Sequence, residues 1–286
     1  MSGGAVTVLY VSDLDGTLLN DRQGLSATTV EIINGLVAEG LLFTVATARS
    51  PGPVVKLLHD LDLRLPIIGM NGAAVADPAT GALLHRATLS APVTAGLVDE
   101  RLAAGLNPFV FTMDEAGEHH VYHRTIGNDC ERTWVDNRLA LGDRRFRQVD
   151  DLAPAYAEEI FAVTVLAPRA DLVPLHDRAA ADPQLYAHLS PDIYVDGFWW
   201  LETHHADANK GAAVTWVAEH VAADRIVCFG DNGNDLPMFA VADEAYAMAG
   251  ASPEVLAAAT AMIGSHTDDA VARFLRDVTG VTLIGE

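Results

Sequence analysis

The segment Ala5–Thr17 reads AVTVLYVSDLDGT. Its first eight residues, Ala5–Ser12, are mostly apolar or β-branched, which is typical of a strand buried on both faces of a sheet. Two carboxylates, Asp13 and Asp15, follow at once, and Gly16 allows the backbone to turn away sharply. A buried strand that ends in paired acids predicts a parallel sheet with a polar site at its carboxyl edge.

Strand and helix patterns alternate in both outer parts of the chain. Ser26 predicts the N-cap of a helix that ends at Gly40, and Leu41–Ala46 predicts a second buried strand. The alternation resumes near Asp207 and includes a strand at Ile226–Gly230. This pattern predicts an α/β fold with a Rossmann-like, doubly wound parallel sheet.

The middle of the chain follows a different pattern. Phe109–Met113 and His120–His123 flank a polar turn, which indicates a hairpin, and helices lie between further strands. We therefore expect a core domain made of residues 1–81 and 190–286, with an α+β cap domain inserted at residues 82–189.

Composition excludes several classes of function. The chain has 286 residues, half of them hydrophobic, and a formal net charge of −21, so nucleic acid and anionic membrane surfaces would repel it. The two cysteines, Cys130 and Cys228, form no disulfide framework. We see no signal peptide and no membrane span, and we expect a cytoplasmic monomer or homodimer.

Three further polar clusters stand where strands end or helices begin. Thr47 follows the second strand, where its hydroxyl and the N–H groups of a helix start can bind phosphate oxygens. Lys210 opens a helix and can neutralise both phosphate and nearby carboxylates. Asp231, Asn234 and Asp235 follow the strand that starts at residue 226, and Asn234 can donate to phosphate.

The acidic residues point to a metal. Asp13 and Asp15 repel each other unless a positive charge lies between them, and Asp231 adds a third carboxylate at the same edge of the sheet. Such hard oxygen ligands suit Mg²⁺. Each cluster alone could be a turn or a helix cap, but their order and placement together favour a magnesium-dependent phosphate site.

The chain resembles the haloacid dehalogenase (HAD) superfamily in four motifs. They are DLDGT, the threonine of VATARS, the lysine of NKG, and GDNGND, in this order. The size and place of the insert resemble the Cof-type phosphatase branch with an α/β (type IIB) cap. Met70–Ala73 and Thr267–Leu275 also resemble segments of that branch, so the resemblance covers essentially the whole chain.

The resemblance implies a role for each acid. Asp13 would be the nucleophile and a Mg²⁺ ligand. Asp15 would be the general acid and base, with its backbone carbonyl on the metal. Asp231 would bind Mg²⁺, and Asp235 would bind it directly or support it.

The resemblance also implies which residues hold the substrate. Thr47, Lys210 and Asn234 would bind the transferring phosphate. Arg49 and Asn71 are the candidates for touching the rest of the substrate from the core domain.

The expected function is that of a phosphoric monoester hydrolase. It would hydrolyse a small phosphorylated metabolite, such as a sugar phosphate, through a phospho-aspartate intermediate. One alternative is a sugar-phosphate mutase, which uses the same nucleophile but passes the phosphate to a sugar hydroxyl. The other is a non-catalytic sensor of a phosphorylated ligand.

Overall fold

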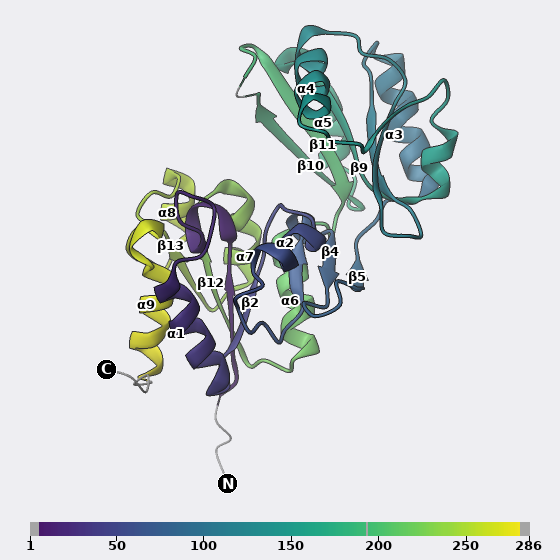
Figure 1. Cartoon of the computed structure of the whole chain (residues 1–286). Helices are drawn as coiled ribbons and strands as arrows, with labels where there is room; N and C mark the ends of the chain where they lie inside the picture. The colour runs from purple at the N-terminus through teal and green to yellow at the C-terminus, as the bar shows by residue number, and fades with distance from the viewer. Residues whose placement is uncertain (1–5, 193, 281–286) are drawn as a thin grey trace. The chain divides into compact units, whose positions relative to one another are not determined.

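The computed structural model describes residues 6–192 and 194–280, and Figure 1 shows the chain. It divides into two compact units. The core unit comprises Met1–Arg86 with Ala208–Glu286, and the inserted unit comprises Ala87–Asp207.

The core unit is built on a five-stranded parallel sheet with the order β14-β13-β12-β1-β2. The strands are β1 (Val8–Ser12), β2 (Leu42–Val45), β12 (Arg225–Gly230), β13 (Glu244–Ala247) and β14 (Ala261–Met262). The expected start of the first strand, Ala5, lies outside the described residues. Strand β1 is central because it pairs with β2 on one side and with β12 on the other.

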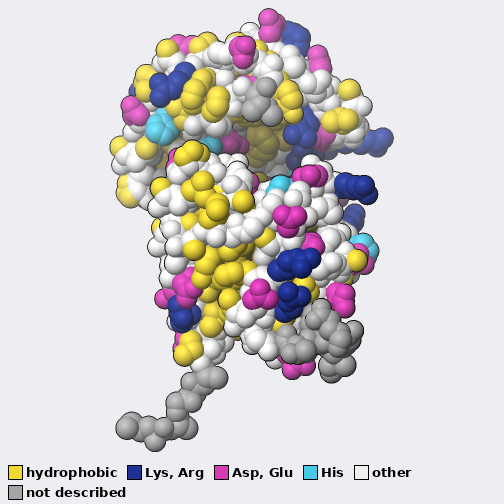
Figure 2. All heavy atoms as spheres, turned by 90° about the vertical axis from the view of Figure 1, so that its left-hand side faces the viewer, with side chains coloured by type: hydrophobic (Ala, Val, Ile, Leu, Met, Phe, Trp, Pro, Cys, Tyr) yellow, Lys and Arg dark blue, Asp and Glu magenta, His cyan; other side chains and the backbone are white. Residues whose placement is uncertain are grey.

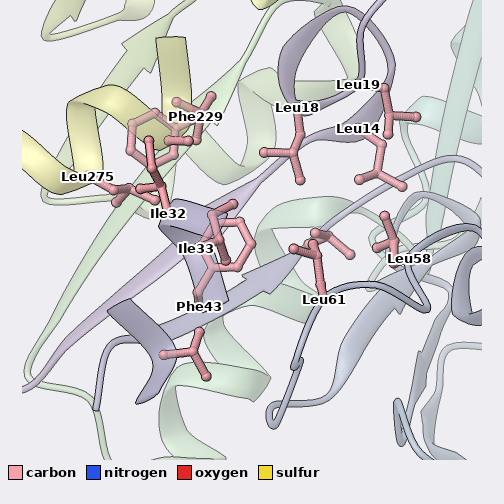
Figure 3. Packing of buried hydrophobic residues seen from close by; sticks show 14 of the residues in the cluster. Leu14, Leu18, Leu19, Ile32, Ile33, Phe43, Leu58, Leu61, Phe229 and Leu275 are labelled. Atoms are coloured by element: carbon pink, nitrogen blue, oxygen red, sulfur yellow. The ribbon is translucent and has the colours of Figure 1, made fainter. Parts of the chain in front are cut away.

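Helices cover both faces of this sheet, as a doubly wound fold requires. One face carries α1 (Ala27–Ala38), α2 (Pro51–Leu57) and α9 (Ala270–Thr279); the other carries α6 (Lys210–His220), α7 (Leu236–Val241) and α8 (Pro253–Ala258). Ser26 caps α1 as predicted, because its side chain accepts a hydrogen bond from the N–H of Thr29. In Figure 3, Ile32 of α1 and Leu275 of α9 lie beside Phe229 of β12.

The strand that follows α2 belongs to a second, smaller sheet of the core unit. Strand β3 (Ile67–Gly69) meets the parallel sheet only through a bridge between Ala46 and Ile68. It pairs instead with β4 (Ala74–Ala76), which pairs with β5 (Leu83–Arg86), in an antiparallel three-stranded sheet. The tight turn after β3 returns the chain antiparallel at once, so no crossover helix can follow.

The inserted unit holds a six-stranded sheet with the order β10-β11-β9-β6-β7-β8. Its strands are β6 (Phe109–Met113), β7 (His119–His123), β8 (Phe146–Gln148), β9 (Glu159–Pro168), β10 (Leu185–Pro191) and β11 (Phe198–His205). Its helices are α3 (Ala91–Ala103), α4 (Asp129–Ala140) and α5 (Arg169–Ala180). The β6–β7 hairpin was predicted from the sequence.

The inserted unit ends later than expected. Its last residue is Asp207, whereas the sequence predicts that the insert ends at residue 189 and that the core domain resumes at residue 190. The reason is that β11 pairs antiparallel with both β9 and β10, which places the strand with the insert.

Single exposed apolar side chains are scattered on the core unit. Leu256 of α8, Met262 of β14 and Val278 of α9 are 37%, 61% and 53% exposed. Figure 2 looks at the side of the molecule that carries α8 and α9, and shows apolar side chains among acidic and basic ones. Within residues 6–192 and 194–280, no helix is both long enough and apolar enough to cross a lipid bilayer.

Candidate active site

Apart from Asn71, which follows β3, and Lys210, which opens α6, the polar residues singled out from the sequence lie at or just beyond the carboxyl ends of β1, β2 and β12. Because the three strands are parallel neighbours, their carboxyl ends meet at one edge of the sheet. Asp13 extends β1, since its N–H donates to the carbonyl of Phe229 on β12 at 2.9 Å. Thr47 extends β2, since its N–H donates to the carbonyl of Ile68 at 2.9 Å.

A buried lysine joins two of the acids. The Nζ atom of Lys210 lies 2.6 Å from Oδ1 of Asp13 and 2.6 Å from Oδ1 of Asp235. Lys210 and Asp235 are completely buried, and Asp13 is only 5% exposed. Asn209 caps α6, because its side chain accepts from the N–H of Ala212, and so fixes the helix start that carries Lys210.

The loop after β12 adds Asp231 to this cluster. The second carboxylate oxygen of Asp235 accepts from the N–H groups of Asp231, at 2.8 Å, and Asn232, at 3.0 Å. The Oδ1 atom of Asp231 accepts from the Thr17 hydroxyl at 3.4 Å. Asp235 therefore both pairs with the lysine and shapes the loop that presents Asp231.

Burial and mutual repulsion disturb the ionisation of these groups. Removal from water, reinforced by the charges of Asp235 and Asp231, raises the pKa of Asp13 to about 7, although Lys210 opposes the rise. Burial likewise raises the pKa of Asp231, with Asp235 adding to the effect. Burial alone would lower the pKa of Lys210, but the carboxylates of Asp13 and Asp235 raise it above its ordinary value.

The cluster fits a divalent cation. Asp13, Asp231 and Asp235 each offer an oxygen, and the three oxygens lie within 4.8 Å of one another. When ionised, the three carboxylates carry three negative charges, and Lys210 offsets only one of them. Carboxylate oxygens are the ligands that Mg²⁺ prefers, and a dication would balance the remaining charge.

Asp15 points to a different partner. Its two carboxylate oxygens accept from Nε and Nη2 of Arg49 at 2.8 Å and 2.5 Å, in a bidentate ion pair. The Asp15 side chain is 49% exposed, so it faces solvent rather than the buried cluster. The sequence predicts that Arg49 lies near substrate, but its ion pair with Asp15 is not evident from the sequence.

Four of the proposed substrate-binding residues form a second connected group. The Nδ2 atom of Asn234 donates to Oδ1 of Asn71 at 3.0 Å. The N–H of Asn71 donates to the carbonyl of Thr47 at 2.9 Å, and the Thr47 hydroxyl accepts from the N–H of Arg49 at 3.2 Å. Thr47 is buried, which leaves its hydroxyl in a fixed position.

Comparison with known proteins identifies the family. The model of the haloacid dehalogenase-like hydrolases matches residues 10–275, which is nearly the whole chain. The chain belongs to this family.

The relatives of this haloacid dehalogenase-like hydrolase include curated phosphatases. YwtE of Bacillus subtilis (strain 168), a 5-amino-6-(5-phospho-D-ribitylamino)uracil phosphatase, is 29% identical and covers 92% of this chain and 95% of its own length. YbhA of Escherichia coli (strain K12), a pyridoxal phosphate phosphatase, is 25% identical, and the match covers 94% of this chain and 97% of the length of YbhA.

A solved structure shows the same fold. The subclass IIB sugar phosphatase BT4131 is 18% identical, covers 96% of this chain and 100% of its own, and has a TM-score of 0.67. Together, the comparisons confirm the expected superfamily, its Cof-type branch with a IIB cap, the expected fold and the expected enzyme class, a phosphoric monoester hydrolase.

The structure gives Thr17 a role in the site and adds a second role for Gly16. Thr17, the last residue of DLDGT, donates to Asp231. Gly16 has a φ of +81°, and a Cβ atom there would lie 2.3 Å from Oδ2 of Asp231, so only glycine lets the two loops approach. Both residues belong to the DLDGT motif, so their position next to Asp13 and Asp15 is the sequence feature that could have identified them.

Proposed function

We propose that this haloacid dehalogenase-like hydrolase is Mg²⁺-dependent and removes phosphate from a small phosphorylated metabolite through a phospho-aspartate at Asp13. The observation that carries the proposal is the buried ion cluster, in which Lys210 holds Asp13 and Asp235 at 2.6 Å each and Asp231 completes a three-carboxylate group. A buried nucleophile beside a fixed cation is what attack on a phosphate anion requires.

The metal-binding residues would be Asp13, Asp231 and Asp235, together with the backbone carbonyl of Asp15. Bound there, Mg²⁺ supplies positive charge that offsets the negative charge of the phosphate oxygens. Lys210 supplies a further charge from the protein and keeps the Asp13 side chain in one orientation.

The reaction then divides into two steps. In the first, a carboxylate oxygen of Asp13 bonds to phosphorus while the bond to the leaving oxygen breaks, and Asp15 gives that oxygen a proton. In the second, Asp15 takes a proton from water, and the water oxygen bonds to phosphorus. The acyl phosphate bond breaks, so that phosphate leaves and the Asp13 carboxylate is restored.

The phosphate oxygens would be held by side chains from three separate loops. Thr47 offers a hydroxyl, Asn234 offers an amide N–H, and Lys210 offers its ammonium group. Arg49 forms an ion pair with Asp15 in the structure. Its guanidinium is a further candidate for binding the phosphate or the leaving group.

A small metabolite is the favoured class of substrate. The relatives named above act on phosphorylated ribityl and pyridoxal compounds, according to their names, and BT4131 is named a sugar phosphatase. A chain with a net charge of −21 is poorly suited to a polyanion such as nucleic acid. The cytoplasmic location and a monomeric or homodimeric state stay predictions.

The test is a phosphate-release screen with sugar phosphates, nucleotides and cofactor phosphates, run with Mg²⁺ and again with excess EDTA. We expect release from at least one small phosphate ester, loss of release in EDTA, and no turnover by Asp13→Asn. The matched control is Asp60→Asn, which changes an exposed acid of the core unit and should keep full activity.

Three results would contradict the proposal. An active Asp13→Asn variant would remove the nucleophile assignment. Turnover only in the presence of a bisphosphate activator would favour a mutase. Binding of a phosphorylated ligand without any release would favour a sensor.

A further inference from the structure

The turn after β3 has an unusual backbone. Met70, Asn71 and Gly72 have φ values of +53°, +54° and +97°, so three successive residues lie in the left-handed region. Glycine adopts this region freely and asparagine tolerates it, but methionine is strained there. Such a run persists only where the surroundings hold it in place.

The backbone of this turn is held against the loop after β2, which presents a phosphate-binding group. The N–H of Met70 donates to the carbonyl of Arg49, and the N–H of Asn71 donates to that of Thr47, both at 2.9 Å. The turn therefore fixes the loop after β2, which carries the Thr47 hydroxyl.

The same turn meets the start of α6. A Cβ atom at Gly72 would lie 2.1 Å from the carbonyl oxygen of Asn209 and 3.0 Å from the backbone nitrogen of Lys210. Only a residue without a side chain allows this approach, so Gly72 sets how closely the start of α6 packs against the turn.

The Asn71 side chain reaches the third loop. Its Oδ1 atom accepts from Nδ2 of Asn234 at 3.0 Å. A primary amide has two N–H groups. The contact with Asn71 uses one of them and fixes the plane of the amide, which leaves the second N–H of Asn234 in a set direction.

We infer that Asn71 is a positioning residue that acts through Asn234, and that the strained Met70–Gly72 turn aligns the three loops that hold the phosphate. The inference rests on the proposed function and deepens it. Asparagine meets both demands of the position, because it tolerates a positive φ and offers an acceptor oxygen. The sequence predicts that Asn71 touches substrate, and the structure gives its side chain a protein partner, Asn234.

The decisive variant is Asn71→Gly, because glycine keeps the left-handed backbone and removes only the side chain. Its matched control is Ala222→Gly, since Ala222 also has a positive φ, +53°, at the end of α6 and outside the site. Asn234→Ala and the double variant Asn71→Gly/Asn234→Ala complete a double-mutant cycle.

The readouts are the Kd of inorganic phosphate in the presence of Mg²⁺, measured by calorimetry, and KM and kcat for a substrate found in the screen. We expect Asn71→Gly to weaken phosphate binding and raise KM about tenfold, as loss of one hydrogen bond to a charged group predicts. Asn234→Ala should show a similar loss, and the double variant no further loss. Ala222→Gly should bind phosphate as the wild type does.

The outcomes separate this inference from the proposed function. Wild-type phosphate affinity in Asn71→Gly, additive losses in the double variant, or no phosphate binding by the wild type would each overturn the positioning role. An active Asp13→Asn variant would instead overturn the proposed function. Unfolding midpoints of all four variants show whether any loss of binding comes from loss of the fold.

Discussion

Replacement of Asp13 by asparagine should stabilise the metal-free protein while it abolishes turnover. Asp13 and Asp235 are buried, Asp231 lies half-buried beside them, and Lys210 pairs with Asp13 and Asp235. This environment raises the pKa of Asp13 from 3.8 to about 7. At about 1.4 kcal/mol per pH unit, the rise corresponds to about 4 kcal/mol of stability lost when Asp13 ionises in the folded protein.

The pH dependence of this effect has a definite sign. Between pH 3.8 and about 7, Asp13 stays protonated in the folded protein but ionises in the unfolded chain. The folded state then holds more protons, so the free energy of unfolding falls as the pH rises, and the loss is complete above about pH 7. Asparagine does not ionise, so the free energy of unfolding of the Asp13→Asn variant does not fall for this reason as the pH rises.

The assay is urea unfolding in EDTA over a series of pH values, with Asp60→Asn as the surface control. We expect Asp13→Asn to exceed the wild type by up to about 4 kcal/mol near pH 7.5 and by no more than about 1 kcal/mol near pH 4.5. Added Mg²⁺ should narrow the gap, because it stabilises only proteins that bind it. A difference that does not change with pH, or a less stable variant at pH 7.5, would refute the reasoning.

Three further changes test other parts of the site. Lys210→Met should lower the free energy of unfolding by about 3–5 kcal/mol near pH 7.5, because it leaves buried carboxylates without their cation; an unchanged urea midpoint would contradict this. Gly211→Ala places a Cβ 2.3 Å from the carbonyl oxygen of Pro237 and should destabilise α6 and α7 by about 1–3 kcal/mol in the same assay, whereas Gly250→Ala, with open space around it, should not. Asp15→Asn should lower kcat/KM, which reports the steps up to release of the leaving group, by about 10²–10⁴-fold for an alkyl phosphate but much less for p-nitrophenyl phosphate, whose leaving group departs without a proton; equal losses of kcat/KM would argue against the acid role.

Features encoded in a short stretch of chain could be predicted from the sequence. The apolar run before Asp13 predicts a buried strand, because runs of apolar and β-branched residues are typical of strands covered on both faces, and β1 lies there. Parallel order then placed the ends of β1, β2 and β12 at one edge, which brought Asp13 and Asp235 to the same buried lysine.

Features that depend on pairing between distant segments could not be predicted in the same way. The residues of β11 do not themselves indicate that this strand pairs antiparallel with β9 rather than returning to the core. The Arg49–Asp15 ion pair depends on side-chain reach across two loops. The Asn-Gly pair at 71–72 indicates a turn, but it does not reveal that Met70 also adopts a positive φ.

The placement of β1 between β2 and β12 affects the order in which the chain can fold during synthesis. Val8 pairs with Arg225, so the edge of β1 that faces β12 stays unpaired until more than two thirds of the chain has been synthesised. The inserted unit is continuous in sequence, and its own sheet is complete by Asp207, before β12 leaves the ribosome. Asp13 and Asp231, which follow the two strands of that late pairing, therefore come together only near the end of translation, and a chain truncated before residue 225 would lack the candidate active site.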